Sequence, residues 1–101
     1  MATYGENQRL VKQNVFTLLE EHEDTRNDDK LLMLKYWQMF DQINTSIGFG
    51  PSFLRRATTP ESITRARRAI QSAGLFEPTD PEVRRKRRIR EEEAREHHAT
   101  N

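Results

Sequence analysis

The chain has 101 residues, a formal net charge of +1 and no cysteine. This length allows one small domain with a core near the lower limit for independent folding, and the lack of cysteine excludes disulfide bonds and thiolate metal sites. No apolar run approaches the roughly 18 residues of a membrane span, and the first residues do not have the pattern of a signal peptide. We therefore expect a cytoplasmic protein that does not bind membranes.

The first half of the chain predicts two helices. After a disordered segment, residues 1–5, a helix over residues 6–21 has an apolar face that includes Val15, Leu18 and Leu19. Residues 22–27 are polar and interrupt the pattern, and Asp28 or Asp29 can cap a second helix over residues 30–43. Apolar residues nearly encircle this second helix, which predicts the central core helix. We expect five residues to share one core: Leu34, Trp37, Phe40, Ile63 and Ile70.

Two shorter helices follow a loop at residues 44–50. The first, residues 51–57, begins at Pro51. The second, residues 60–73, has Thr58 or Thr59 as its N-cap and Gly74 as its left-handed stop, and Thr58 with Glu61 fits the spacing of a capping box. The two helices with their tight turn are a helix-turn-helix candidate, although the turn lacks the usual glycine.

The helix over residues 60–73 has two chemically distinct faces. At 100° per residue, Ile63, Ala66, Ile70 and Ala73 form an apolar stripe, with Arg67 and Gln71 at its rim. The opposite face carries Glu61, Thr64, Arg65, Arg68 and Ser72. A recognition helix in a DNA major groove needs this combination of a narrow packing stripe and an outer face of guanidinium, hydroxyl and amide groups. The simpler alternative is a helix that packs on a core and leaves its charges in water.

Charge is unevenly distributed along the chain. Residues 1–53 carry a net charge of −3, residues 54–90 carry +7 and the remainder carries −3. Ten of the eleven basic residues in the middle segment are arginine, which favours bidentate contacts with phosphates or carboxylates. This asymmetry indicates a polyanion or an acidic protein surface as partner.

Residues 78–101 are expected to form a charged, partly helical tail next to a helical domain at residues 6–77. Its only apolar residues before the last few positions are Val83, Ile89 and Ala94, so a solvated, frayed helix is one interpretation. In the other, residues 84–90 lie along phosphates and become ordered on binding. No alternating strand pattern follows the proposed recognition helix, so we expect no wing.

Three segments together resemble a class of small phage-encoded proteins: residues 23–32, residues 59–71, and Val83 with the Arg- and Glu-rich end. Members of this class are usually expected to have a helix-turn-helix or winged-helix-like fold, and most have no assigned role. The resemblance covers roughly residues 23 to 95. It implies a phage product that acts inside a bacterial cell.

Signals for catalysis, metals or cofactors are absent from the sequence. There is no HExxH motif, phosphate-binding loop or nucleophile elbow, and two of the three histidines, His97 and His98, lie in the charged tail. Asp24, Asp28 and Asp29 lack the glycine and glutamate of a calcium-binding loop. We therefore do not expect an enzyme or a cofactor.

These patterns predict an all-α bundle with a helix-turn-helix core that binds double-stranded DNA, most simply a phage transcription regulator. The expected base-contacting residues are Thr64, Arg65, Arg68 and Gln71. The expected phosphate-contacting residues are Arg55, Arg56, Arg67, Arg84, Arg85, Lys86, Arg87 and Arg88. Since one recognition helix has a small footprint, specific binding calls for a homodimer.

The alternative function is a phage effector that inhibits a host protein through the same arginine-rich face, which would then bind an acidic surface. Exposed aromatic residues around that face would favour this alternative, because aromatic residues are enriched in protein interfaces. The residues to inspect are Tyr4, Phe49 and Phe76.

Overall fold

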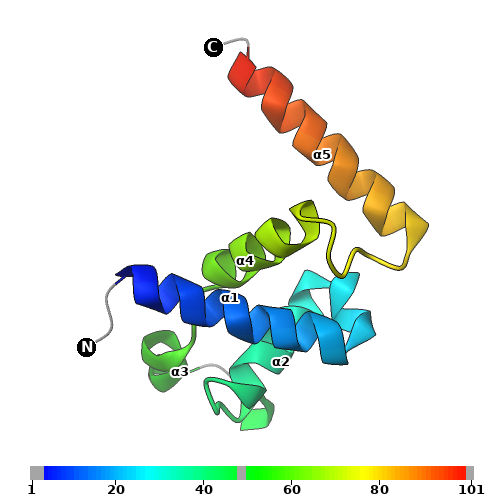
Figure 1. The fold of residues 1–101 in the computed structure, drawn as a ribbon. Coiled ribbons are helices and arrows are strands. Elements are labelled where there is room, and N and C mark those ends of the chain that lie inside the picture. Colours follow the sequence, from blue (N-terminus) through cyan, green and yellow to red (C-terminus); the bar gives the residue numbers. More distant parts are fainter. Residues whose placement is uncertain (1–3, 48–49, 100–101) are drawn as a thin grey trace.

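The computed structural model describes residues 4–47 and 50–99, and this part of the chain is helical and contains no β-strand (Figure 1). The expectation of a small all-α bundle is therefore confirmed. The α-helices are α1 (Tyr4–Glu21), α2 (Asp29–Met39), α3 (Pro51–Arg56), α4 (Pro60–Ser72) and α5 (Pro81–Ala99), with 3₁₀ turns η1 (Glu23–Arg26) and η2 (Thr45–Ile47).

The core lies between α1, α2 and α4. Its fully or nearly buried residues are Val15, Leu18 and Leu19 of α1, Leu32 and Tyr36 of α2, and Ile63, Ala66 and Ile70 of α4. Each of these three helices contacts the other two, and the contacts of α1 are the most extensive, so α1 rather than the expected α2 is the central helix. Although α2 is apolar nearly all round, only one of its faces meets the bundle: Met39 is 47% exposed and Leu34 is only partly buried. Trp37 and Phe40 pack at the edge of the core.

Helix α2 begins where the sequence predicted and ends four residues early. The carboxylate of Asp28 accepts the backbone N–H groups of Lys30 and Leu31, which satisfies donors that the first helical turn leaves unpaired. The helix stops at Met39 because the chain turns at Gln42, which has a φ of 54°. Ile43, expected as the last helical residue, lies beyond the end of α2. Its N–H donates to the carbonyl of Trp37.

Helix α4 begins at the expected threonine pair, with Thr59 as its N-cap accepting from the N–H of Ser62. The expected capping box is not formed. Thr58 instead donates its N–H and its hydroxyl to the carboxylate of Asp41, at 2.7 and 3.0 Å, while Glu61 is paired with Arg65. Gly74 has a φ of 86°, in agreement with the predicted left-handed stop. Ala73, expected on the apolar stripe, is exposed as the C-cap.

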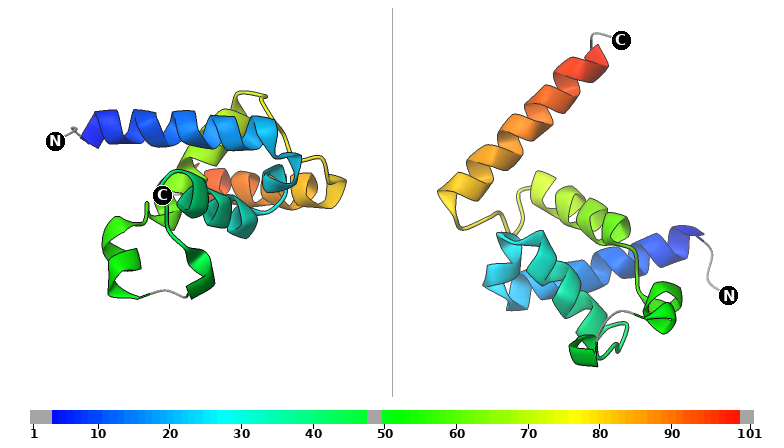
Figure 2. Two further views of the ribbon diagram at one scale, coloured as in Figure 1. Left: turned by 90° about the horizontal axis from the view of Figure 1, so that it is seen from below. Right: turned by 180° about the vertical axis from the view of Figure 1, so that it is seen from behind.

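Helix α3 is joined to α4 by residues 57–59, in the order expected for a helix-turn-helix, but it lies at the edge of the bundle (Figures 1 and 2). Phe53 contacts Trp37 edge-to-face, with ring centroids 4.8 Å apart. Leu54 is 80% exposed. A six-residue helix has too little surface to bury both side chains. Of the two large apolar residues of α3, only Phe53 therefore attaches the helix to the bundle.

Helix α5 extends away from the bundle, with α4 lying between it and α1 in Figure 1. The connector before it is fixed to the bundle. The ring of Phe76 packs edge-to-face on Phe16, at 4.9 Å between centroids, and the side chain of Asn27 bonds to both Thr79 and Asp80. Residues 81–99 form one continuous helix, whereas the sequence analysis expected a partly helical tail.

Candidate nucleic-acid interface

The inner face of α4 determines which of its side chains point outward. Because Ile63, Ala66 and Ile70 are buried against α1 and α2, the opposite face is exposed and includes Arg65 and Arg68. Arg65 forms an ion pair with Glu61 one turn earlier, and both side chains are more than half exposed. Such a pair contributes little to stability, so another partner can displace the glutamate at small cost.

Thr64 and Gln71, the other two expected base-contacting residues, are placed differently. Thr64 is partly buried, and its hydroxyl donates to the carbonyl of Pro60 at 3.0 Å. Gln71 is engaged inside the structure. Its amide nitrogen donates to the carbonyl of Phe76 at 2.8 Å, and its amide oxygen accepts from Arg87 at 3.1 Å. Gln71 therefore joins α4 to the connector and to α5, and its amide group faces these partners and not the outer face of α4.

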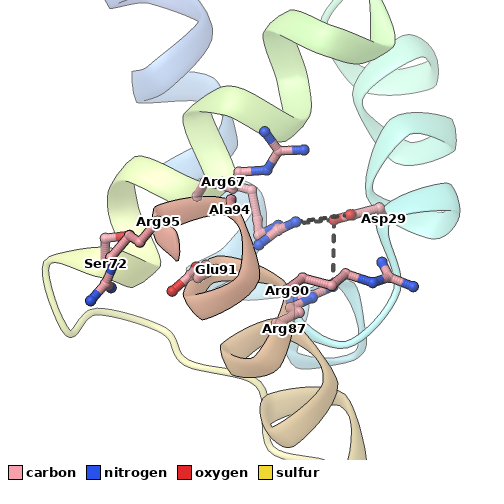
Figure 3. A pocket seen from close by; sticks show the side chains of 9 residues that line it. Asp29, Arg67, Ser72, Arg87, Arg90, Glu91, Ala94 and Arg95 are labelled. Atoms are coloured by element: carbon pink, nitrogen blue, oxygen red, sulfur yellow. Dashed lines mark hydrogen bonds and ion pairs between the residues drawn. The ribbon is translucent and has the colours of Figure 1, made fainter. Parts of the chain in front are cut away.

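Arg67 and Arg87, both expected at phosphates, converge on a single carboxylate instead (Figure 3). Arg67 is 5% exposed and donates from Nε and Nη2 to the two oxygens of Asp29, each at 3.0 Å. Arg87 approaches Asp29 at 3.5 Å and donates to the backbone carbonyl of Arg26 at 2.7 Å. Burial, followed by the positive charge of Arg67, lowers the pKa of Arg87, and Asp29 partly offsets this effect. Both arginines therefore hold helices together through Asp29.

The other residues expected to contact phosphate differ in whether their side chains already have a partner within the structure. Arg56 donates to the carbonyl of Asp41 and Arg84 to that of Pro78, while Arg85 pairs with Glu82. Among the expected phosphate-contacting residues, Arg55, Lys86 and Arg88 are exposed and make neither an ion pair nor a side-chain hydrogen bond within the described residues.

A cleft of about 590 Å³ opens between α4 and α5 (Figure 3). Its lining contains five arginines and two acidic residues, a net charge of +3: Asp29, Arg67, Arg68, Ser72, Arg87, Arg90, Glu91, Ala94 and Arg95. The sequence analysis did not single out Arg95, and it included Arg90 only as the end of the basic run of residues 84–90. A helical wheel of α5 would have placed Arg87, Arg90 and Ala94 on one face, but only the fold shows that this face is turned toward α4.

Within the described residues, no three or more His, Asp or Glu side chains are arranged to hold a metal ion, and no helix has both the length and the apolar character of a membrane span. Comparison of the chain with protein families, curated proteins and solved structures found no match.

Proposed function

We propose that the protein binds double-stranded DNA and that the outer face of α4 enters the major groove. One observation carries this proposal: α4 is fixed on α1 and α2 by its buried stripe, which leaves Arg65 and Arg68 projecting from the opposite side. A guanidinium group matches the two acceptors that guanine presents in the major groove. The two arginines are three residues apart and therefore nearly one turn apart on the same face.

The exposed basic residues on α3 and α5 supply the contacts to the DNA backbone. Arg55, Lys86 and Arg88 are free of ion pairs within the described part of the chain, so binding a phosphate does not require them to leave another partner. Each such contact releases counterions and makes the affinity depend on salt.

The Asp29–Arg67–Arg87 cluster has a positioning role in this proposal. It links α2, α4 and α5 through side chains that are partly or wholly buried. The base-reading helix and the basic helix are thereby held in a defined relative orientation before DNA binds, which reduces the entropy lost on association. A homodimer that places two copies of α4 on neighbouring half-sites would give the footprint that a specific regulator of transcription needs.

The alternative, inhibition of a host protein, receives no specific support from the aromatic residues. The side chains of Tyr4 and Phe49 lie outside those that the structure describes. Phe76 is partly buried against Phe16, and the guanidinium group of Arg26 lies 5.1 Å from the centre of its ring. It therefore does not form an exposed aromatic border around the basic face.

Titration of the full chain against a labelled pool of random duplexes, at about 50 and 200 mM salt, tests the proposal. We expect binding that weakens steeply with salt, and the Lys86→Glu/Arg88→Glu variant should bind all duplexes more weakly with a shallower salt slope. Glu92→Gln/Glu93→Gln, which alters exposed acidic residues of the same helix, is the matched control and should not weaken binding. If the unaltered protein shows no binding at the lower salt concentration, the proposal is wrong and the host-protein alternative replaces it.

A further inference from the structure

We propose that the cleft between α4 and α5 is a binding site for a small phosphoryl group with two or more negative charges, such as a phosphomonoester or a pyrophosphate. This site goes beyond duplex binding, because it depends on Arg90 and Arg95, which the duplex proposal does not use. Of the two base-reading arginines it includes Arg68 and not Arg65.

The balance of charge in the cleft is the first argument. Five guanidinium groups face two carboxylates. Arg67 and Arg87 share Asp29, so this group of three alone carries one uncompensated positive charge. Arg68, Arg90 and Arg95 make no ion pair within the described residues. Like charges that face one another across a partly enclosed space repel, and an anion placed between them removes that repulsion.

The arrangement of the side chains is the second argument. Arg68 and Ser72 lie one turn apart on α4, and Arg90 lies one turn before Ala94 on the facing side of α5. Figure 3 shows Ser72 and Arg95 at one end of the cleft and Asp29 at the other. The small side chains of Ser72 and Ala94 leave the space between the arginines open. Guanidinium groups from two helices can then bind one phosphoryl group from both sides.

The chemistry of the lining selects the ligand class. Arginine presents paired N–H donors that match the oxygens of a phosphoryl group, and such charge-assisted hydrogen bonds are stronger than neutral ones. Ala94 is the one apolar residue among the nine that line the cleft, and a cleft of about 590 Å³ does not admit a DNA duplex. A net charge of +3 fits an anion with two or more charges better than the single charge of an internal phosphodiester.

The floor of the cleft connects the ligand to the position of α5. Arg87 of α5 reaches Asp29 of α2, Gln71 of α4 and the carbonyl of Arg26 in η1. These polar contacts place the arginines of α5 at the cleft. An anion bound between α4 and α5 would add contacts to the same docked arrangement and hold α5 in place.

Calorimetric titration of the full chain with inorganic pyrophosphate, at constant ionic strength, tests the site. We expect saturable binding with one anion per chain. The Arg90→Gln/Arg95→Gln variant should bind about tenfold more weakly or worse, since each change removes a charge-assisted contact. Arg55→Gln on α3 is the control for a general loss of charge and should bind like the unaltered protein. Circular dichroism checks that α5 remains helical.

A second pair of variants tests whether removing a negative charge from the cleft strengthens the binding of pyrophosphate. Glu91 lines the cleft and opposes the anion, so Glu91→Gln should bind pyrophosphate severalfold more tightly, while Glu92→Gln, one residue further along the helix, should not. The proposal is overturned if pyrophosphate does not saturate the protein, if Arg55→Gln weakens binding as much as the cleft variant, or if both glutamate variants behave alike.

Competition between pyrophosphate and oligonucleotides shows whether the phosphoryl group belongs to a nucleic-acid strand or to a free phosphate compound. If 5′-phosphorylated oligonucleotides compete with pyrophosphate and 5′-hydroxyl oligonucleotides of the same sequence do not, the ligand is the terminal phosphate of a strand. If pyrophosphate binds and neither oligonucleotide competes, the ligand is a free phosphate compound. Both results support the site. Duplex binding is assayed separately with Arg65→Ala, which lies outside the cleft, so failure of one proposal does not imply failure of the other.

Discussion

Asp29 of α2 accepts two hydrogen bonds from Arg67 of α4, Nε to Oδ1 and Nη2 to Oδ2, both at 3.0 Å. The arginine side chain is 7% exposed and the aspartate side chain 31% exposed. A buried guanidinium needs such a partner because its charge is no longer solvated. The pair therefore fixes the approach of α4 to the start of α2, beside the apolar core.

Replacing Asp29 by asparagine should destabilise the fold. Loss of one partner of a buried ion pair costs about 3–5 kcal/mol, and we expect about 2–3 kcal/mol here because solvent reaches Asp29. Urea denaturation measures the change. Glu20→Gln, an exposed change on α1, is the control and should alter stability by less than about 0.5 kcal/mol. Equal stabilities of the two variants would show that the ion pair contributes nothing.

Replacing Arg87 by glutamine should loosen α5 without unfolding the bundle. The main polar links of α5 to α2, α4 and η1 pass through this side chain, whereas the core lies between α1, α2 and α4. Amide hydrogen exchange should show faster exchange along α5 and nearly unchanged protection in α1 and α4. Arg88→Gln, exposed on the same helix, should leave both patterns unchanged. Unaltered exchange in Arg87→Gln would contradict the linking role.

Two large-to-small substitutions should show that the core contributes much more to stability than the exposed side of α3. Ile70 is 2% exposed, so Ile70→Ala should cost about 2–5 kcal/mol, enough to unfold much of so small a domain. Leu54 is 80% exposed, so Leu54→Ala should change stability by less than about 0.5 kcal/mol. Thermal unfolding followed by circular dichroism measures both. A large loss for Leu54→Ala would show that α3 packs more closely than described.

Local signals in the sequence were sufficient to predict the helices. The cap at Asp28, the threonine at position 59, the proline after it and the glycine at position 74 each act within one turn, so they can be recognised without the fold. The same holds for the buried stripe of α4, where Ile63, Ala66 and Ile70 follow helical periodicity.

Contacts between distant residues were not predictable in this way. Arg67 and Gln71 lie at the rim of the apolar stripe of α4. A helical wheel cannot show whether residues at that rim are exposed to solvent or covered by another helix. Asp29 lies 38 residues before Arg67 and 58 residues before Arg87. No local sequence signal marks Asp29 as the partner of these two arginines. The expectation that α2 is the central helix was wrong for the same reason, because the sequence of an evenly apolar helix does not show which of its faces is covered.

The most direct test of the central claim compares the affinity for a selected duplex with that for random duplexes. The variants are Arg68→Ala, Arg65→Ala and Lys86→Glu/Arg88→Glu, measured at about 150 mM salt. Each alanine variant should lose roughly 1–3 kcal/mol of preference for the selected sequence and keep most of its affinity for random DNA. The α5 variant should weaken binding to both kinds of duplex equally. If the unaltered protein shows no preference for any duplex, or if the alanine variants keep the full preference, α4 does not read DNA and the central claim is wrong.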